Sequence, residues 1–200
     1  MNGVVGVDSA TDQLTHLSLK YRAQNVYPYL RTKFHVTRLK GTNTSRAAVR
    51  NAVLAQGIVY VTGIGHGEMD AFGGAANNPF FRVGGYDPQE AHAKIIHLMS
   101  CLSALALGPD MVENGAHAFF GYDAAIVDSD DALACDSEID LGFADGLSAR
   151  EVYTRTMDAF DARIAELESR HFDASSLAFN QSHLCAPSTH GRFGNEDAHL

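Results

Sequence analysis

Short, almost continuously apolar segments recur along the chain and alternate with stretches of helical periodicity. The predicted strands cover residues 3–8, 34–39, 58–63, 93–100 and 116–122. Most of them have no polar face, and strands of this kind occur in parallel sheets that helices cover on both sides. The sequence therefore predicts an α/β fold, a three-layer α/β/α sandwich with a mostly parallel central sheet.

Helices are predicted between these strands, over about 14–26, 42–57, 102–115 and 148–170. Ser or Thr at position 44 or 45 can cap the second helix, and Ser148 with Glu151 makes a capping box at the start of the last. The Gly/Asn/Pro-rich segment 64–92 predicts a long loop, which is usually functional or partly disordered. The acidic segment 128–140 is irregular and predicts a solvated loop.

The length of 200 residues suits one domain with a sizeable core. No internal repeat or linker is visible, so we expect a single domain over 1–200, with a core over about 3–170 and a polar C-terminal segment over 171–200. The first residues, MNGVVGVDSATDQ, lack the features of a signal peptide. A cytoplasmic location is expected, unless the chain is a fragment without its leader.

The charge balance narrows the range of partners. The chain has 24 acids, 15 Lys and Arg residues and a net charge of −9, with no basic cluster of the kind that binds nucleic acid. No apolar run approaches the roughly 18 residues of a membrane helix. We therefore expect neither a nucleic-acid nor a membrane partner, and the oligomeric state stays open. The three cysteines include no close pair, which predicts free thiols.

Two polar residues lie just past consecutive predicted strands. His66 follows the strand over 58–63 in TGIGHGE, and Cys101 follows the strand over 93–100 in HLMSCL. Active sites of open parallel sheets lie beyond the carboxyl ends of the strands. A thiol becomes a strong nucleophile when a nearby imidazole takes or shares its proton. If the two strands are neighbours in the sheet, His66 and Cys101 form a catalytic pair.

Backbone N–H groups near this pair can hold a developing oxyanion. Cys101 is predicted to begin a helix, whose N-terminus favours a thiolate and offers N–H groups. Gly67 adds an unhindered N–H group next to the histidine. We therefore expect the amides of Gly67 and Cys101 to form an oxyanion hole.

The segment YVTGIGHG, an interval of about 30 residues, an apolar strand ending in SC, and then LGPDMVENGAHAFFGYD together resemble the caspase-like (clan CD) cysteine peptidases. The similarity is closest to the bacterial branch around gingipain, clostripain and the CHAT-type proteases, and it covers about residues 3–125. It implies a caspase-like fold and a peptide or protein substrate. It also implies an endopeptidase that works through a Cys–His dyad and an acyl-enzyme, with Cys101 as nucleophile and His66 as base.

One position departs from the pattern of these peptidases. Several relatives with Arg or Lys specificity carry an aspartate two residues before the nucleophile, and that position is Met99 here. Either the substrate pocket is apolar around Met99, or another acid recognises a basic residue. The candidates are Asp8 and Asp12 after the first strand and Asp123 after the fifth.

Other kinds of site fit the sequence less well. His92, His97 and Cys101 are spaced by five and four residues, which does not converge on one ion on a strand or on a helix. No metal is therefore expected, and His97 is predicted to be a core histidine. The glycines of GIGHGE follow the third strand and precede a long loop, so a dinucleotide is not expected. We expect no cofactor of any kind.

Two further functions stay open. The Met99 departure and the poorly patterned C-terminus favour a catalytically weak or inactive caspase-like domain that serves as a binding or assembly module. The same dyad would also suit a non-proteolytic thiol hydrolase or an acyltransferase.

Overall fold

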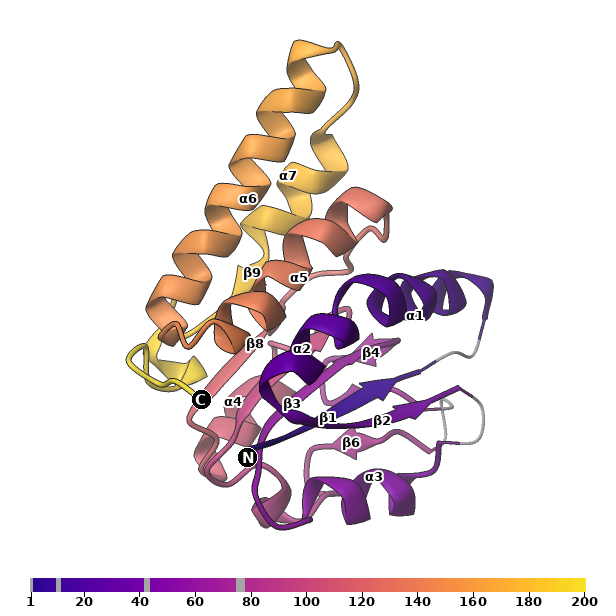
Figure 1. Cartoon of the computed structure of the whole chain (residues 1–200), viewed down its shortest axis with the longest axis vertical. Helices are drawn as coiled ribbons and strands as arrows, with labels where there is room; N and C mark the ends of the chain where they lie inside the picture. The colour runs from indigo at the N-terminus through magenta and orange to yellow at the C-terminus, as the bar shows by residue number, and fades with distance from the viewer. Residues whose placement is uncertain (1, 10–11, 42–43, 75–77) are drawn as a thin grey trace.

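A six-stranded sheet in the order β2–β1–β3–β7–β8–β9 forms the centre of the molecule (Figure 1). The computed structural model describes residues 2–9, 12–41, 44–74 and 78–200. The strands are β1 (Gly3–Asp8), β2 (His35–Lys40), β3 (Ile58–Ile64), β7 (Ile95–Met99), β8 (Ala118–Tyr122) and β9 (Leu184–Cys185). All neighbours are parallel except β8 and β9, which confirms the predicted α/β fold with a mostly parallel sheet.

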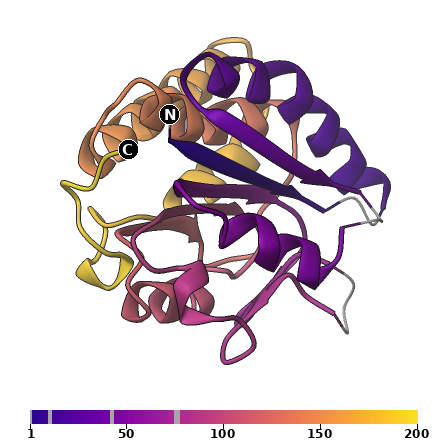
Figure 2. The same cartoon turned by 60° about the horizontal axis from the view of Figure 1, so that its bottom comes forward.

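Helices cover both faces of this sheet. They are α1 (Gln13–Asn25), α2 (Tyr27–Lys33), α3 (Arg46–Val53), α4 (Leu107–Glu113), α5 (Asp130–Ala144), α6 (Ala149–Ser169) and α7 (Ser175–Ser182). Figure 2 shows the sheet between α1, α2 and α5 on one side and α3 and α4 on the other. Helices α6 and α7 form a hairpin that packs on α5 and extends away from the sheet (Figure 1).

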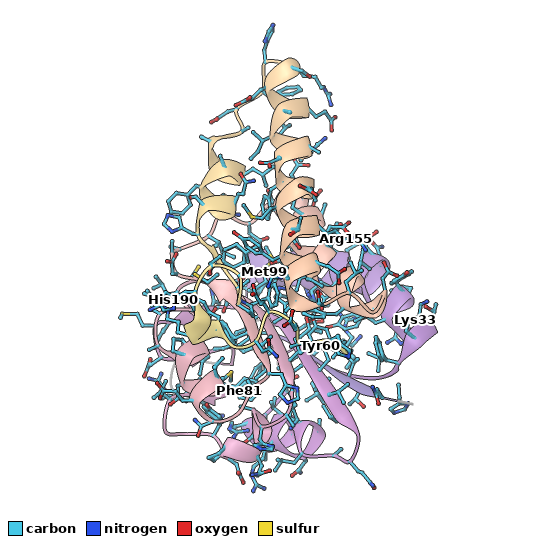
Figure 3. All side chains as sticks on the ribbon, turned by 90° about the vertical axis from the view of Figure 1, so that its left-hand side faces the viewer. Lys33, Tyr60, Phe81, Met99, Arg155 and His190 are labelled. Atoms are coloured by element: carbon cyan, nitrogen blue, oxygen red, sulfur yellow. The ribbon has the colours of Figure 1, made fainter. Side chains whose placement is uncertain are left out.

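Side chains alternate between the two faces of each strand and build two apolar cores. Tyr60 and Met99, labelled in Figure 3, are buried in the core shared with α2, α5 and α6. Val61 and Leu98, on the opposite face, pack in the core with α3 and α4. Strands β1, β7 and β8 are buried along their whole length, which explains their continuous apolar sequences.

The register of β3 and β7 brings two loop segments together. Ile64, the last residue of β3, pairs with Met99, the last residue of β7. The segments that follow these strands therefore start side by side. Gly67 packs so tightly here that a Cβ at this position would lie 2.3 Å from the carbonyl oxygen of Cys101. Glycine is the residue that permits this approach of one backbone to the other.

The segment between β3 and β7 has more structure than the predicted loop. It forms a three-stranded antiparallel sheet of β4 (Gly67–Glu68), β5 (Ala71–Phe72) and β6 (Phe81–Arg82). Phe72 and Phe81 from this small sheet are buried against α3 and α4. Its aromatic residues are therefore part of the core between the sheet and helices α3 and α4. Its first strand holds Gly67 beside Cys101.

The acidic segment 128–140 is a helix rather than the predicted loop. The side chain of Ser129 caps α5 by accepting a hydrogen bond from the N–H of Ala132. Asp130 and Asp131 lie in its first turn, where carboxylates interact favourably with the helix dipole. Two later acids, Asp136 and Asp140, are buried beneath the sheet. The prediction was wrong because the sequence alone does not distinguish these acids from the acids of a solvated loop. Some of them begin a helix, and others are paired with basic residues inside the core.

The helix predicted over 102–115 is shorter than expected. Residues 101–106 form turns, and α4 begins only at Leu107. Leu102 has a φ of +60°, a left-handed conformation that no regular helix contains. Cys101 therefore does not begin a helix, which corrects the expectation that a helix N-terminus assists its thiol.

Two other helices begin close to their predicted starts. The side chain of Ser45 caps α3, whereas residues 42 and 43 of the predicted helix lie outside the described residues. Ser148 and Glu151 form the predicted capping box at the start of α6, which is confirmed. Among the described residues, none of the helices combines the length and the apolar character needed to cross a membrane.

Segment 171–200 contributes to the body of the molecule. It supplies α7 and β9, and the two residues of β9 pair antiparallel with Gly121 and Tyr122 of β8. Leu177 and Leu184 are buried with α5 and α6 in the core. This polar stretch of sequence therefore helps to cover β8, the last long strand of the sheet.

Buried charges connect α1, the sheet and α5 beneath the candidate site. The guanidinium of Arg22 lies 3.2 Å from Asp8 and 2.9 Å from Asp140. The imidazole of His97 lies 3.5 Å from Asp140 and 3.2 Å from Asp136. Burial alone would lower the pKa of His97, but the two carboxylates outweigh it and raise this pKa to about 9. His97 is thus a core histidine with polar partners, as predicted.

Candidate active site

His66 and Cys101 line the same pocket at the carboxyl edge of the sheet. Ile64, Gly65 and His66 reach it from the end of β3, and Met99, Ser100 and Cys101 reach it from the end of β7. The parallel pairing of these two neighbouring strands explains why residues 35 positions apart in sequence meet here. The structure thus brings together the two residues that the sequence singled out.

The remaining wall of the pocket comes from two other segments. Thr15 belongs to the first turn of α1, and Ile126 and Asp128 belong to the connection between β8 and α5. Together with Ile64 and Met99, Ile126 makes part of this wall apolar. A thiol, an imidazole, an apolar wall and one carboxylate therefore meet in a pocket of about 50 Å³.

His66 makes a close contact with Asp12, which precedes α1. Its Nε2 atom lies 2.5 Å from Oδ2 of Asp12, and both side chains are about half exposed. The N–H of Thr15 and then the His66 imidazole lower the pKa of Asp12 to about 2. The carboxylate is thus ionised at neutral pH and accepts the proton of Nε2, which leaves Nδ1 as the basic nitrogen of the ring.

Cys101 lies in the turn that follows β7 and is partly exposed. The next residue, Leu102, donates its N–H to the carbonyl of Ala124 at 3.0 Å, which ties this turn to the segment after β8. Ser100 is buried beside it, and its Oγ has no hydrogen-bond partner among the described residues. Cys101 therefore lies on a turn that is tied to the segment after β8, and it lines the pocket.

The other two cysteines are placed differently. Cys135 in α5 and Cys185 in β9 are buried, and neither lines the pocket. Burial raises the pKa of each of these two thiols to about 12. Because the thiolate is the reactive form, both are expected to be inert at neutral pH.

The acids expected to recognise substrate do not line the pocket. Asp8 is fully buried, and its carboxylate bonds to Arg22 and to Arg38. Asp123 lies 2.8 Å from Nδ1 of His183, and Asp12 faces His66. Of the four residues expected to bind substrate, only Met99 lines the pocket, as a buried apolar residue.

The acid in the pocket, Asp128, was missed by sequence reasoning. It is the first residue of the acidic segment that was expected to be a solvated loop. Its position two residues before α5, on the connection that leaves the carboxyl end of β8, is the signal that points to it. Once α5 is known, Asp128 belongs to the edge of the sheet where the site lies.

Sequence comparisons give no relative: no family model matches the chain, and no curated protein does. Among solved structures, the chain is similar to the Arg-specific cysteine proteinase gingipain R, with a TM-score of 0.63 and 11% sequence identity. The match covers 99% of this chain and 47% of that proteinase, so the chain spans about half of its length. At this identity the likeness shows the fold alone, and that fold is caspase-like.

Proposed function

We propose that the chain is a caspase-like cysteine endopeptidase of clan CD, with Cys101 as nucleophile and His66 as its proton-transfer partner. One observation carries the proposal: both residues line one pocket at the ends of the neighbouring strands β3 and β7. Cys101 is partly exposed, whereas Cys135 and Cys185 are buried, and this difference supports the choice of nucleophile. The caspase-like fold is consistent with this chemistry.

Peptide hydrolysis then follows in two stages. The sulfur of Cys101 attacks the peptide carbonyl carbon, its proton passes to His66, and a tetrahedral oxyanion forms. The C–N bond breaks as His66 gives that proton to the departing amine, which leaves a thioester on Cys101. A water molecule attacks the thioester, gives a proton to His66, and releases the carboxylic acid as the thiol is restored.

Asp12 has a supporting role in this proposal. Its ionised carboxylate, 2.5 Å from Nε2, fixes the ring and favours the tautomer with a basic Nδ1. It also stabilises the imidazolium that forms during transfer. Because the pair is half exposed, we expect a moderate contribution rather than the full effect of a buried triad acid.

The backbone N–H groups of Gly67 and Cys101 are proposed as donors to the oxyanion. The close approach of Gly67 to the backbone carbonyl of Cys101 supports the assignment, because it brings these two stretches of backbone together beside the pocket. Loss of one such donor costs about 2.7–4 kcal/mol of transition-state stabilisation in well-studied enzymes. A Cβ at position 67 would displace the whole turn as well.

The test compares three proteins on a peptide library: wild type, Cys101→Ala and the matched control Cys185→Ala. We expect Cys101→Ala to abolish cleavage and labelling by a thiol-directed peptide probe, while its circular dichroism and melting temperature stay near those of wild type. Cys185→Ala should keep both activities, because its thiol is buried and protonated. Mass spectrometry of the labelled wild type should place one label, on Cys101.

Two outcomes would contradict the proposal. Cleavage that survives in Cys101→Ala would exclude this nucleophile. A folded wild type that labels at Cys101 but cleaves no peptide, and transfers no acyl group, would favour a binding or assembly module on the same fold.

A further inference from the structure

Asp128 lines the pocket, and among the described residues no basic side chain pairs with its carboxylate. The four fully buried acids of the described chain each contact a base, and they are Asp8, Glu90, Asp136 and Asp140. Asp128 makes one hydrogen bond, in which its Oδ2 accepts the hydroxyl of Ser18 at 2.5 Å. Its Oδ1 is buried and has no hydrogen-bond partner among the described residues.

The charges near Asp128 make this arrangement costly for the free protein. Burial raises the pKa of its carboxyl, and the negative charges of Asp136, Asp130 and Asp12 raise it further. An ionised carboxylate among like charges, with one buried oxygen unpaired, is the kind of defect that native proteins usually repair. A positive group entering the pocket would repair it.

The residues that line the pocket indicate which kind of side chain would bring that positive group. Ile64, Met99 and Ile126 give the pocket apolar walls, which suit the methylene stem of a long side chain. Asp128 supplies the only carboxylate on the lining of the pocket formed by the described residues. An apolar stem that ends in a cation matches this combination, and lysine and arginine are the residues built that way.

We propose that Asp128 is the specificity-determining residue of the site and binds the cationic side chain of a substrate lysine or arginine next to the bond that Cys101 attacks. The inference rests on the proposed peptidase function. It replaces the acids named from the sequence, Asp8, Asp12 and Asp123, each of which already contacts a basic side chain of the protein. Ser18 on α1 holds Oδ2 of this carboxylate, which leaves Oδ1 without a hydrogen-bond partner among the described residues.

The experiment uses peptides that differ only at the residue before the cleaved bond. Lysine is compared with its uncharged counterpart norleucine, and arginine is compared with citrulline. The proteins are wild type, Asp128→Asn, and Asp130→Asn as a control that removes an exposed acid two residues away. Asparagine keeps the size of aspartate and can still accept the hydroxyl of Ser18.

We expect wild type to favour each charged peptide over its neutral counterpart by roughly 10- to 100-fold in kcat/KM, the usual range for a hydrogen-bonded charge. Asp128→Asn should lose this preference, whereas Asp130→Asn should keep it. Cleavage by wild type without a charge preference would overturn the proposal, and so would a preference that survives in Asp128→Asn.

Binding to the Cys101→Ala protein separates this proposal from the peptidase assignment. Calorimetry or NMR titration there should show tighter binding of the lysine peptide than of the norleucine peptide, and Cys101→Ala/Asp128→Asn should bind both equally. Charge-selective binding without cleavage by wild type would support the Asp128 site and reject the peptidase. Cleavage by wild type, together with binding that does not depend on the charge of the peptide, would support the peptidase and reject the Asp128 site.

Discussion

At the scale of single residues, Asp12 serves two roles that substitution can separate. It caps α1 by accepting the N–H of Thr15 at 2.9 Å, and it contacts Nε2 of His66. Asn and Ser are also good N-cap residues, so Asp12→Asn and Asp12→Ser should both keep the stability of the helix. Neither keeps the negative charge, and serine is too short to reach His66.

We therefore predict that Asp12→Asn lowers kcat/KM by about 10-fold, the difference between a charged and a neutral hydrogen bond, and that Asp12→Ser lowers it at least as much. The melting temperatures should stay within a few degrees of wild type. Kinetics measured beside thermal unfolding checks both parts. Full activity in Asp12→Ser would show that the contact with His66 has no part in the reaction.

The sequence predicts the residues of the site unevenly. His66 and Cys101 can be found because each directly follows an apolar strand, and the edge of a parallel sheet brings such positions together. Asp12 and Asp128 lie farther past the ends of β1 and β8, where the strand order alone does not determine their contacts. Their partners, His66 and Ser18, lie 54 and 110 positions away, and those contacts depend on how α1 and the β8–α5 connection pack.

At the scale of elements, the contact of β7 with α5 depends on one protonated histidine. His97 has a pKa of about 9 because Asp136 and Asp140 outweigh the effect of burial, against about 6.5 in an unfolded chain. A raised pKa adds stability that is fully present below about pH 6.5 and is lost as the pH rises through 9. The loss amounts to about 3 kcal/mol.

We predict that the free energy of unfolding in urea falls by about this amount between pH 6 and pH 9.5 in wild type. His97→Gln should be less stable at pH 6 and should show a much flatter dependence on pH. Thr62, Arg22 and Tyr122 also contact this group of charges. Because the variant leaves these three residues unchanged, a difference in pH dependence between the two proteins reports on His97. Parallel pH curves for the two proteins would contradict the assignment.

Elements were predictable where one local signal dominated. Four of the five long strands, all except β2, follow from their apolar runs, and the start of α6 follows from its capping box. The short strands β4, β5, β6 and β9 have two residues each, too few for any periodicity. Helix α5 was hidden because its buried acids, Asp136 and Asp140, are neutralised by Arg22 and His97 from distant elements.

At the scale of the whole molecule, the polar C-terminal sequence is part of the fold. Leu177 and Leu184 fill the core beside α5 and α6, and β9 pairs with β8. We predict that a chain ending at residue 170 loses cooperative thermal unfolding, because this apolar surface and the edge of β8 become exposed. Circular dichroism and a scanning melt check it.

The matched control for this truncation is Phe172→Ser. Phe172 lies in the same segment with 55% of its surface exposed, so its replacement should leave the melting temperature nearly unchanged. A truncated chain that melts as sharply as the full one would show that 171–200 is dispensable.

The charges on β2 have a consequence for behaviour in concentrated solution. This strand ends the sheet, and its unpaired backbone groups offer a template on which another chain can add a strand. Exposed His35 and Lys40 stand at its two ends. If two copies met edge to edge in antiparallel register, each Lys40 would face a His35, and a lysine on an edge strand disfavours such pairing. The same strand that completes the sheet thus carries, in Lys40, a charge that opposes edge-to-edge aggregation.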